Sequence, residues 1–140
     1  MERFQKGVTL MELLIVGVII GILASIAYPS YRAQVMRSHR SDAKVALERA
    51  AQTLERCFTN SNPKGYGACP APNAGSDNGY YAIAVNIPAP PADQAFTLTA
   101  TAVGGQLQDE QCRSFTLTDT NVRTAKTSAN VDNLAACWGR

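Results

Sequence analysis

The stretch Lys6-Gly7-Val8-Thr9-Leu10-Met11-Glu12-Leu13-Leu14-Ile15-Val16 decides how this chain is organised. A short leader containing Arg3 and Lys6 ends at Gly7, and a long apolar run follows. The run contains one carboxylate, Glu12, and then no Asp, Glu, Lys, Arg or His before Arg32. An ionised side chain inside a membrane helix is costly, so Glu12 marks a position with a function.

Residues 8–28 have the length of one membrane span. As a helix they would extend about 31 Å, at about 1.5 Å per residue, which matches a hydrocarbon core of about 30 Å. The basic residues of the leader favour a cytoplasmic N-terminus. We therefore expect a single-pass inner-membrane protein whose head, residues 29–140, lies in the periplasm or outside the cell.

The segment from Lys6 to about Pro29 resembles the class III signal of type IV prepilins and pseudopilins. In that family a leader ending in Gly is followed, as a rule, by Phe-Thr-Leu-Ile-Glu-Leu, and Val8 and Met11 depart from it. The resemblance implies that residues 1–7 are a leader peptide, which prepilin peptidase removes by cutting between Gly7 and Val8. The same enzyme would N-methylate Val8, and Glu12 would become the fifth mature residue.

A secretory signal peptide or a plain signal anchor is the alternative. A secretory signal has an apolar core of about 7–15 residues followed by a cleavage site of the Ala-x-Ala type. Here the apolar run is longer, contains a carboxylate and lacks such a site. These differences favour the prepilin interpretation. It implies that Glu12 neutralises the terminal amine of an adjacent subunit during filament assembly, rather than merely reaching the lipid headgroups.

Two features of the apolar segment concern helix packing. Gly17 and Gly21 form a G-x-x-x-G pair, a spacing that lets membrane helices approach closely. Pro29 lacks an N–H and clashes with the preceding turn, so it predicts a kink. The resemblance adds that residues 8–28 form the core of a filament after assembly.

The head shows first a helical and then a strand-like pattern. Residues 36–58 place apolar side chains on one stripe, and Asn60, Asn62 and Pro63 predict the end of the helix. Residues 81–87, 96–102 and 115–118 alternate apolar and polar side chains with the period of half-buried strands, and a fourth strand is expected at 122–126. We expect an α+β fold, with a long N-terminal helix packed on an antiparallel sheet of about four strands.

The chain contains four cysteines, Cys57, Cys69, Cys112 and Cys137. In an exported head these favour disulfides, for which three pairings are possible. Pairing of neighbours in sequence, Cys57 with Cys69 and Cys112 with Cys137, is the simplest. The second loop also resembles the disulfide-bounded C-terminal region of many type IV pilins.

Nothing in the sequence indicates an enzyme, a cofactor or a metal. There is one His and no Cys-x-x-Cys pair, which disfavours a zinc site. We identify no candidate nucleophile–base pair, and Gly104-Gly105 is typical of a hairpin turn rather than of a phosphate-binding loop. We interpret the basic cluster at Arg32, Arg37, His39, Arg40 and Lys44 mainly as a solvated helix face.

The head resembles PilE-like minor pilins, which are related to a DNA-binding competence pilin. The resemblance implies a minor subunit of a type IV pilus that supports pilus biogenesis, twitching motility and adhesion. Its expected partners are other pilins in the filament, prepilin peptidase, the inner-membrane assembly platform and, before assembly, the membrane. A major pilin remains an alternative, and a type II secretion pseudopilin is disfavoured by the cysteines.

A competence pilin that binds DNA is a further alternative, from a different functional class. The net charge of +2 argues against strong electrostatic capture of DNA. Phosphate contacts would come from six basic residues: Arg56, Lys64, Arg113, Arg123, Lys126 and Arg140.

Overall fold

The computed structural model describes residues 7–62, 64–90 and 93–139. They fall into two compact units, which divide between residues 35 and 36, and each is considered by itself. Helix α1 spans Leu10–Asn60 and contributes to both units. In the first unit, helical structure continues through Gly17, Gly21 and Pro29, so the proline does not end the helix.

Helix α1 has well-defined ends. The Thr9 hydroxyl accepts a hydrogen bond from the Glu12 amide at 3.2 Å, which caps the first turn. At the other end the helix stops at Asn60, within the expected region. The ammonium group of Lys64 then donates to the carbonyls of Phe58 and Thr59, which are left without helical partners at the C-terminus.

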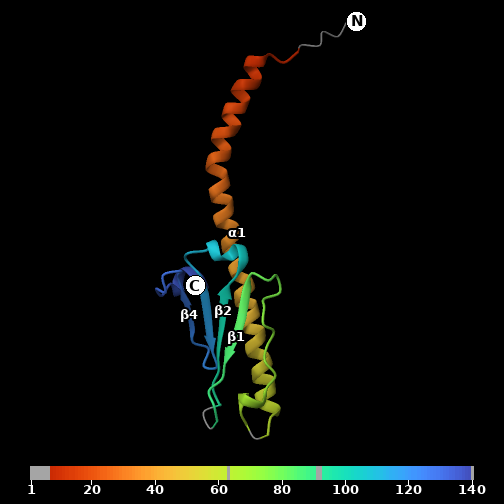
Figure 1. Cartoon of the computed structure of the whole chain (residues 1–140), viewed down its shortest axis with the longest axis vertical. Helices are drawn as coiled ribbons and strands as arrows, with labels where there is room; N and C mark the ends of the chain where they lie inside the picture. The colour runs from red at the N-terminus through yellow and green to blue at the C-terminus, as the bar shows by residue number, and fades with distance from the viewer. Residues whose placement is uncertain (1–6, 63, 91–92, 140) are drawn as a thin grey trace, which may run out of the picture. The chain divides into compact units, whose positions relative to one another are not determined.

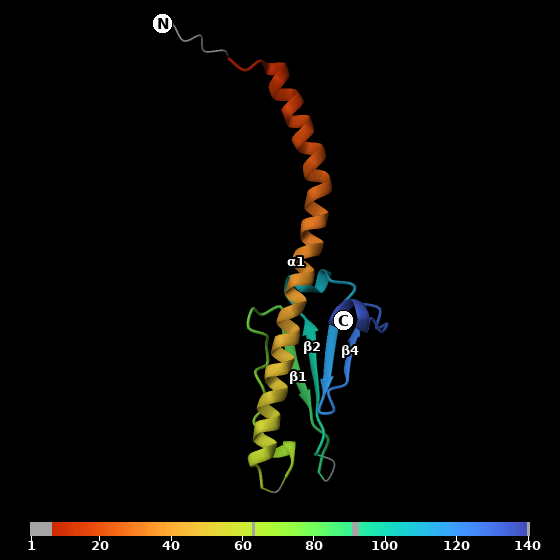
Figure 2. The same cartoon turned by 180° about the vertical axis from the view of Figure 1, so that it is seen from behind.

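The second unit contains a four-stranded antiparallel sheet in the order β1-β2-β3-β4. Its strands are β1 (Tyr81–Asn86), β2 (Thr97–Ala102), β3 (Ser114–Thr118) and β4 (Arg123–Lys126). All neighbouring strands pair antiparallel, so the sheet is a simple meander. Figures 1 and 2, taken from opposite sides, show the C-terminal half of α1 running along one face of this sheet.

The core lies between α1 and the sheet, because each element buries the face that its pattern predicts. Ala43, Leu47 and Leu54 are fully buried on the helix. On the sheet, Leu98 and Phe115 are fully buried, and their polar neighbours point to the other face. The expected α+β architecture of a long helix on four antiparallel strands is confirmed.

Three short helices complete the second unit: η1 (Tyr66–Ala68), η2 (Gly104–Gln108) and α2 (Leu134–Trp138). The interpretation of Gly104-Gly105 as a simple hairpin turn was wrong, because these residues begin η2. Gly104 adopts a positive φ of 54°, and the turn then buries Gln106. Glycine reaches this backbone conformation without steric cost. Helix α2 has only five residues, and no sequence pattern predicted it.

Candidate functional site

The N-terminal unit exposes an almost continuous apolar surface. Its helix contains an apolar window of mean hydropathy 2.6, none of which is buried, and by length and composition it could cross a membrane. Val8 is 71% exposed and Leu10 80%. An apolar surface of this size is unstable in water, so it needs lipid or the helices of other molecules around it.

Glu12 is the one acidic residue in the first turn of this helix. A carboxylate there interacts favourably with the partial positive charge at a helix N-terminus. Its side chain is exposed, and so are Gly7 and Val8 just before the helix. The geometry therefore leaves both the expected cleavage site and the carboxylate accessible to another molecule.

Gly17 and Gly21 face open space. A Cβ added at either position would meet no atom within 4 Å. Neither glycine is needed for packing against the described residues, and a partner helix could approach both. Pro29 lies in the same exposed part of α1.

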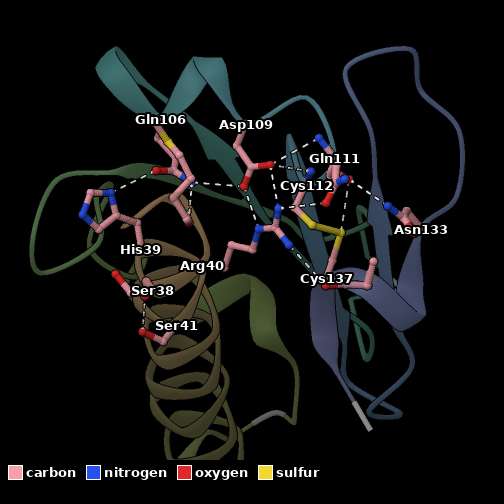
Figure 3. Close-up of polar contacts among 12 residues, drawn as sticks. Ser38, His39, Arg40, Ser41, Gln106, Asp109, Gln111, Cys112, Asn133 and Cys137 are labelled. Atoms are coloured by element: carbon pink, nitrogen blue, oxygen red, sulfur yellow. Dashed lines mark hydrogen bonds and ion pairs between the residues drawn. A yellow bond between two sulfur atoms is a disulfide. The ribbon is translucent and has the colours of Figure 1, made fainter. Parts of the chain in front are cut away.

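In the second unit a buried ion pair joins α1 to the segment before β3 (Figure 3). Arg40 donates from Nε to Asp109 Oδ2 at 2.7 Å and from Nη2 to Oδ1 at 2.9 Å. The side chains are 9% and 3% exposed, respectively. Asp109 Oδ1 also accepts hydrogen bonds from the amides of Gln111 and Cys112 at 3.2 Å, which fixes the entry to the C-terminal disulfide loop.

Gln106 is the second centre of this polar network. Its Nε2 lies within hydrogen-bond distance of the Met36 carbonyl, the Tyr81 hydroxyl and Asp109 Oδ2, at 3.2, 3.1 and 3.2 Å. Its Oε1 lies 3.1 Å from Nδ1 of His39. Burial raises the pKa of the Tyr81 hydroxyl to about 12, because it penalises the charged form. Gln106 and Asp109 thus hold α1 and the segment before β3 together, and no sequence pattern predicted this role.

The expectation that the basic cluster is a solvated helix face is therefore wrong for Arg40, whose guanidinium group is buried. It is also incomplete for Lys44, which donates to the Trp138 carbonyl at 2.9 Å. Partial burial, and then the neighbouring Arg40 and Arg123 charges, lower the pKa of Lys44, since each disfavours a charged ammonium group. Arg37 remains exposed.

Two disulfides bridge Cys57 to Cys69 and Cys112 to Cys137. These are the pairs that neighbour order along the chain favoured. The first holds the loop after α1 to the end of that helix. The second attaches α2 to the segment just before β3. Trp138 of α2 also donates from Nε1 to the carbonyl of Thr124 on β4 at 2.8 Å.

The structure does not gather the candidate DNA contacts into one surface. Arg56 and Lys64 lie near the end of α1, where both are exposed. Arg113 and Lys126 lie close together, because the Arg113 amide donates to the Lys126 carbonyl at 2.8 Å just before β3. Arg123 on β4 pairs with Glu48 at 2.8 Å, so its charge is partly neutralised, and Arg140 lies outside the described residues.

Over the described ranges we find no cluster of three or more His, Cys, Asp or Glu side chains arranged to hold a metal ion. The structure thus offers two features with functional potential. One is the uncovered apolar helix with Glu12, and the other is the surface of a disulfide-bonded head.

Comparison with known proteins agrees with both features. Residues 3–28 match the prokaryotic N-terminal methylation motif. Residues 29–116 match the family described as type IV minor pilin ComP, DNA uptake sequence receptor. Together the two matches extend over most of the chain.

Individual relatives are fimbrial proteins. The chain is 34% identical over 109 residues to fimbrial protein EcpC of Eikenella corrodens, covering 74% of this chain and 68% of that protein. It is 36% identical to a fimbrial protein of Dichelobacter nodosus, with 60% and 54% covered, and 33% identical to the type IV major pilin protein PilE of Neisseria gonorrhoeae, with 62% and 53% covered. The chain thus spans only about half the length of the last two.

Among solved structures, a type IV pilin from Shewanella oneidensis is similar, with 25% identity and a TM-score of 0.48 over 63% of this chain and 89% of that chain. The family assignment depends on the sequence matches. The minor-pilin family model matches more than half of the chain, and the alignment with EcpC covers more than two thirds of that protein. The chain belongs to the type IV pilin family.

Proposed function

We propose that this pilin is a minor structural subunit of a type IV pilus. The observation that supports this most strongly is the unburied apolar helix, which begins at Leu10, three residues after Gly7, and has a single carboxylate in its first turn. Such a helix has two states in which its surface is covered. It spans the membrane before assembly, and it packs against the helices of other pilins afterwards.

Processing prepares the helix for the second state. Cleavage by prepilin peptidase between Gly7 and Val8 removes residues 1–7 and creates a new terminal amine on Val8, which the enzyme methylates. The Glu12 carboxylate then pairs with the terminal amine of an adjacent subunit. In a low-dielectric filament core this pairing is strongly favoured over leaving either charge alone.

The head remains on the periplasmic side while the span 8–28 is in the inner membrane. The assembly platform in that membrane then moves the subunit into the filament, and Gly17, Gly21 and Pro29 allow close packing and local adjustment of the helix. On the cell surface the head, residues 29–140, contributes to pilus biogenesis, twitching motility and adhesion.

Mass spectrometry of pili sheared from the cells tests this function. We expect a low-abundance chain that begins at methylated Val8 and contains two intact disulfides. A dominant chain would identify a major pilin instead. A mature chain found only in the membrane would contradict incorporation into the filament.

A second candidate function is DNA binding during uptake, as in a competence pilin. It is favoured by the match of residues 29–116 to a family described as a DNA uptake sequence receptor. The basic residues support only a modest electrostatic contribution, because they lie in two separate groups and Arg123 is paired with Glu48. Specific recognition would therefore depend on contacts other than phosphate pairing.

A gel-shift assay with the full chain in detergent distinguishes the two functions. A receptor should bind one duplex much more tightly than a scrambled duplex of the same length and composition. Replacing Arg56 and Lys64 by Ala should weaken all binding and reduce the salt dependence by about one unit per lost phosphate contact. Binding that is equal for both duplexes and disappears at moderate salt would contradict a receptor.

A further inference from the structure

Beside α1 in the head is an open cleft of about 390 Å³, here called the Asp42 cleft. Residues of α1 form one wall, and the turn before β1 forms the other. The residues that matter for its chemistry are Asp42, Val45, Asp77, Asn78 and Tyr80. The functions considered so far use none of these side chains.

Asp42 is a buried carboxylate without a cation. The residue is 8% exposed, and the ion pairs among the described residues do not include it. Oδ1 accepts hydrogen bonds from the backbone and side-chain amides of Asn78, at 3.4 and 3.0 Å. Oδ2 is buried and accepts no hydrogen bond from the part of the chain that the structure describes. Burying a carboxylate oxygen without a hydrogen bond or a counter-charge is costly, so we infer that Asp42 has a partner from outside this chain.

The rest of the cleft suits a long basic side chain. Tyr80 presents a half-buried aromatic ring, stacked on His39 with ring centroids 3.7 Å apart, and aromatic faces attract cations. Val45 is 44% exposed and offers apolar surface to the methylene stem of a Lys or Arg. Asp77, which contacts Arg49, adds a second carboxylate at the edge. A calcium ion would need about six to eight oxygen ligands, and fits less well.

The family indicates where such a side chain comes from, because type IV pilins assemble with other pilins in a filament. This chain itself shows what a neighbouring head can offer. On the opposite flank of the same helix, Arg37 and Lys44 line another cleft. A head with an acidic cleft on one flank and basic side chains on the other can make heterologous contacts, which generate helical filaments.

We propose that the Asp42 cleft binds a Lys or Arg side chain from the head of an adjacent pilin. The arriving cation pairs with the Asp42 carboxylate, its stem covers Val45, and its charge lies near the Tyr80 ring. This inference rests on the proposed function, since it needs a subunit inside a filament. It adds a head-to-head contact to the packing of the N-terminal helices.

The test compares full-length wild-type chain with Asp42→Asn and, as a matched control, Asp132→Asn. Asp132 is an exposed acid outside the cleft. Asn keeps the shape and the acceptor for Asn78 but removes the charge. The measured quantity is the amount of chain in sheared pili divided by the amount in the membrane. We expect this ratio to fall about tenfold for Asp42→Asn, because loss of one partner weakens a buried charge pair. Asp132→Asn should be incorporated as the wild type is, and the melting temperature of Asp42→Asn should not fall.

Two results would overturn the inference while leaving the proposed function intact. One is normal incorporation of Asp42→Asn, and the other is a loss accompanied by a lower melting temperature, which would indicate a purely structural Asp42. Absence of the wild-type chain from pili would instead contradict the proposed function.

A photo-crosslinker at Val45 provides a second readout, which does not depend on Asp42. In intact pili it should link to a peptide from the head of another pilin that contains a Lys or Arg. Links only to lipid, or no link at all, would overturn the inference.

Discussion

Arg40 and Asp109, which are 69 residues apart in the sequence, form a bidentate ion pair. Its nitrogen–oxygen distances are 2.7 and 2.9 Å, and both side chains are almost fully buried. The pair joins α1 to the turn that precedes β3 and the C-terminal disulfide. Because Asp109 also accepts two backbone hydrogen bonds, its carboxylate holds the turn and the helix in one arrangement.

Replacing Asp109 by Ala should therefore lower the free energy of unfolding by about 3–5 kcal/mol, since Arg40 would be left as an uncompensated buried charge. Denaturant unfolding of the chain in detergent, followed by fluorescence of the single tryptophan, Trp138, measures the change. Arg49→Ala is the matched control. It breaks the exposed pair with Asp77 and should cost about 1 kcal/mol or less. Equal costs for the two variants would contradict a structural role for the buried pair.

Sequence patterns predicted the parts of this fold that depend on neighbouring residues. The alternation of buried and more accessible side chains at Tyr81–Asn86 and Ser114–Thr118 follows from the strand period, so both strands could be located closely. Asn121 has a positive φ of 59° after β3, a conformation that asparagine tolerates better than most residues. The disulfide pairs also followed from neighbour order.

Contacts between distant residues could not be predicted in this way. Arg40 belongs by sequence to an ordinary basic cluster, and only the fold brings Asp109 to it. Gly104 and Gly105 indicate a turn, but the 3₁₀ helix forms where the buried Gln106 side chain lies within hydrogen-bond distance of four other residues. In the candidate site, Gly7 and Glu12 are recognisable locally, whereas Asp42 becomes unusual only through its burial.

The two disulfides should differ in how much they stabilise the head. Each closes a loop, of 12 residues for Cys57–Cys69 and 25 residues for Cys112–Cys137. Removing either pair by replacement with Ser should cost about 2–4 kcal/mol, and the longer loop should cost about 0.6 kcal/mol more in the chain-entropy model. Denaturant unfolding of the two double variants measures both values. A smaller cost for the 25-residue loop would mean that residual structure in the unfolded chain outweighs loop length.

Alkaline pH should destabilise the head through two tyrosines. Burial raises the pKa of Tyr81 from 10.0 to about 12, and burial with a hydrogen bond to Glu55 raises that of Tyr66 similarly. Between these values the folded chain retains protons that the unfolded chain loses, so stability is complete below about pH 10 and falls as the pH rises toward about 12. The free energy of unfolding, measured across this range, should depend less on pH in the double variant Tyr66→Phe, Tyr81→Phe than in the wild type. Replacing the exposed Tyr31 by Phe should leave the pH dependence unchanged. If Tyr31→Phe reduced it as much as the substitutions at Tyr66 and Tyr81, burial would not be the cause.

Substitution at Gly7 should stop processing. A bulky residue there, for example Gly7→Phe, should leave an uncleaved precursor in the membrane, because the class of leader that this segment resembles ends in Gly. Mass spectrometry of the membrane fraction distinguishes the precursor from a chain that begins at Val8. Mature chain of normal mass in the variant would contradict the assigned cleavage site. Gly17→Ala is the matched control and should be processed normally, since a Cβ there meets open space.

Glu12→Ala should separate processing from assembly. Glu12 lies in the first turn of an exposed helix and contributes no ion pair to the described part of the chain, so its loss should leave the head folded. We expect the variant to be cleaved and methylated at Val8 but to be scarce in sheared pili, because the terminal amine of the neighbouring subunit would be buried without a counter-charge. Glu12→Asp keeps the charge on a shorter side chain and should restore part of the incorporation. If Glu12→Ala entered pili at the wild-type level, the role of the carboxylate would be limited to its charge interaction with the helix N-terminus, a contribution of about 1 kcal/mol or less.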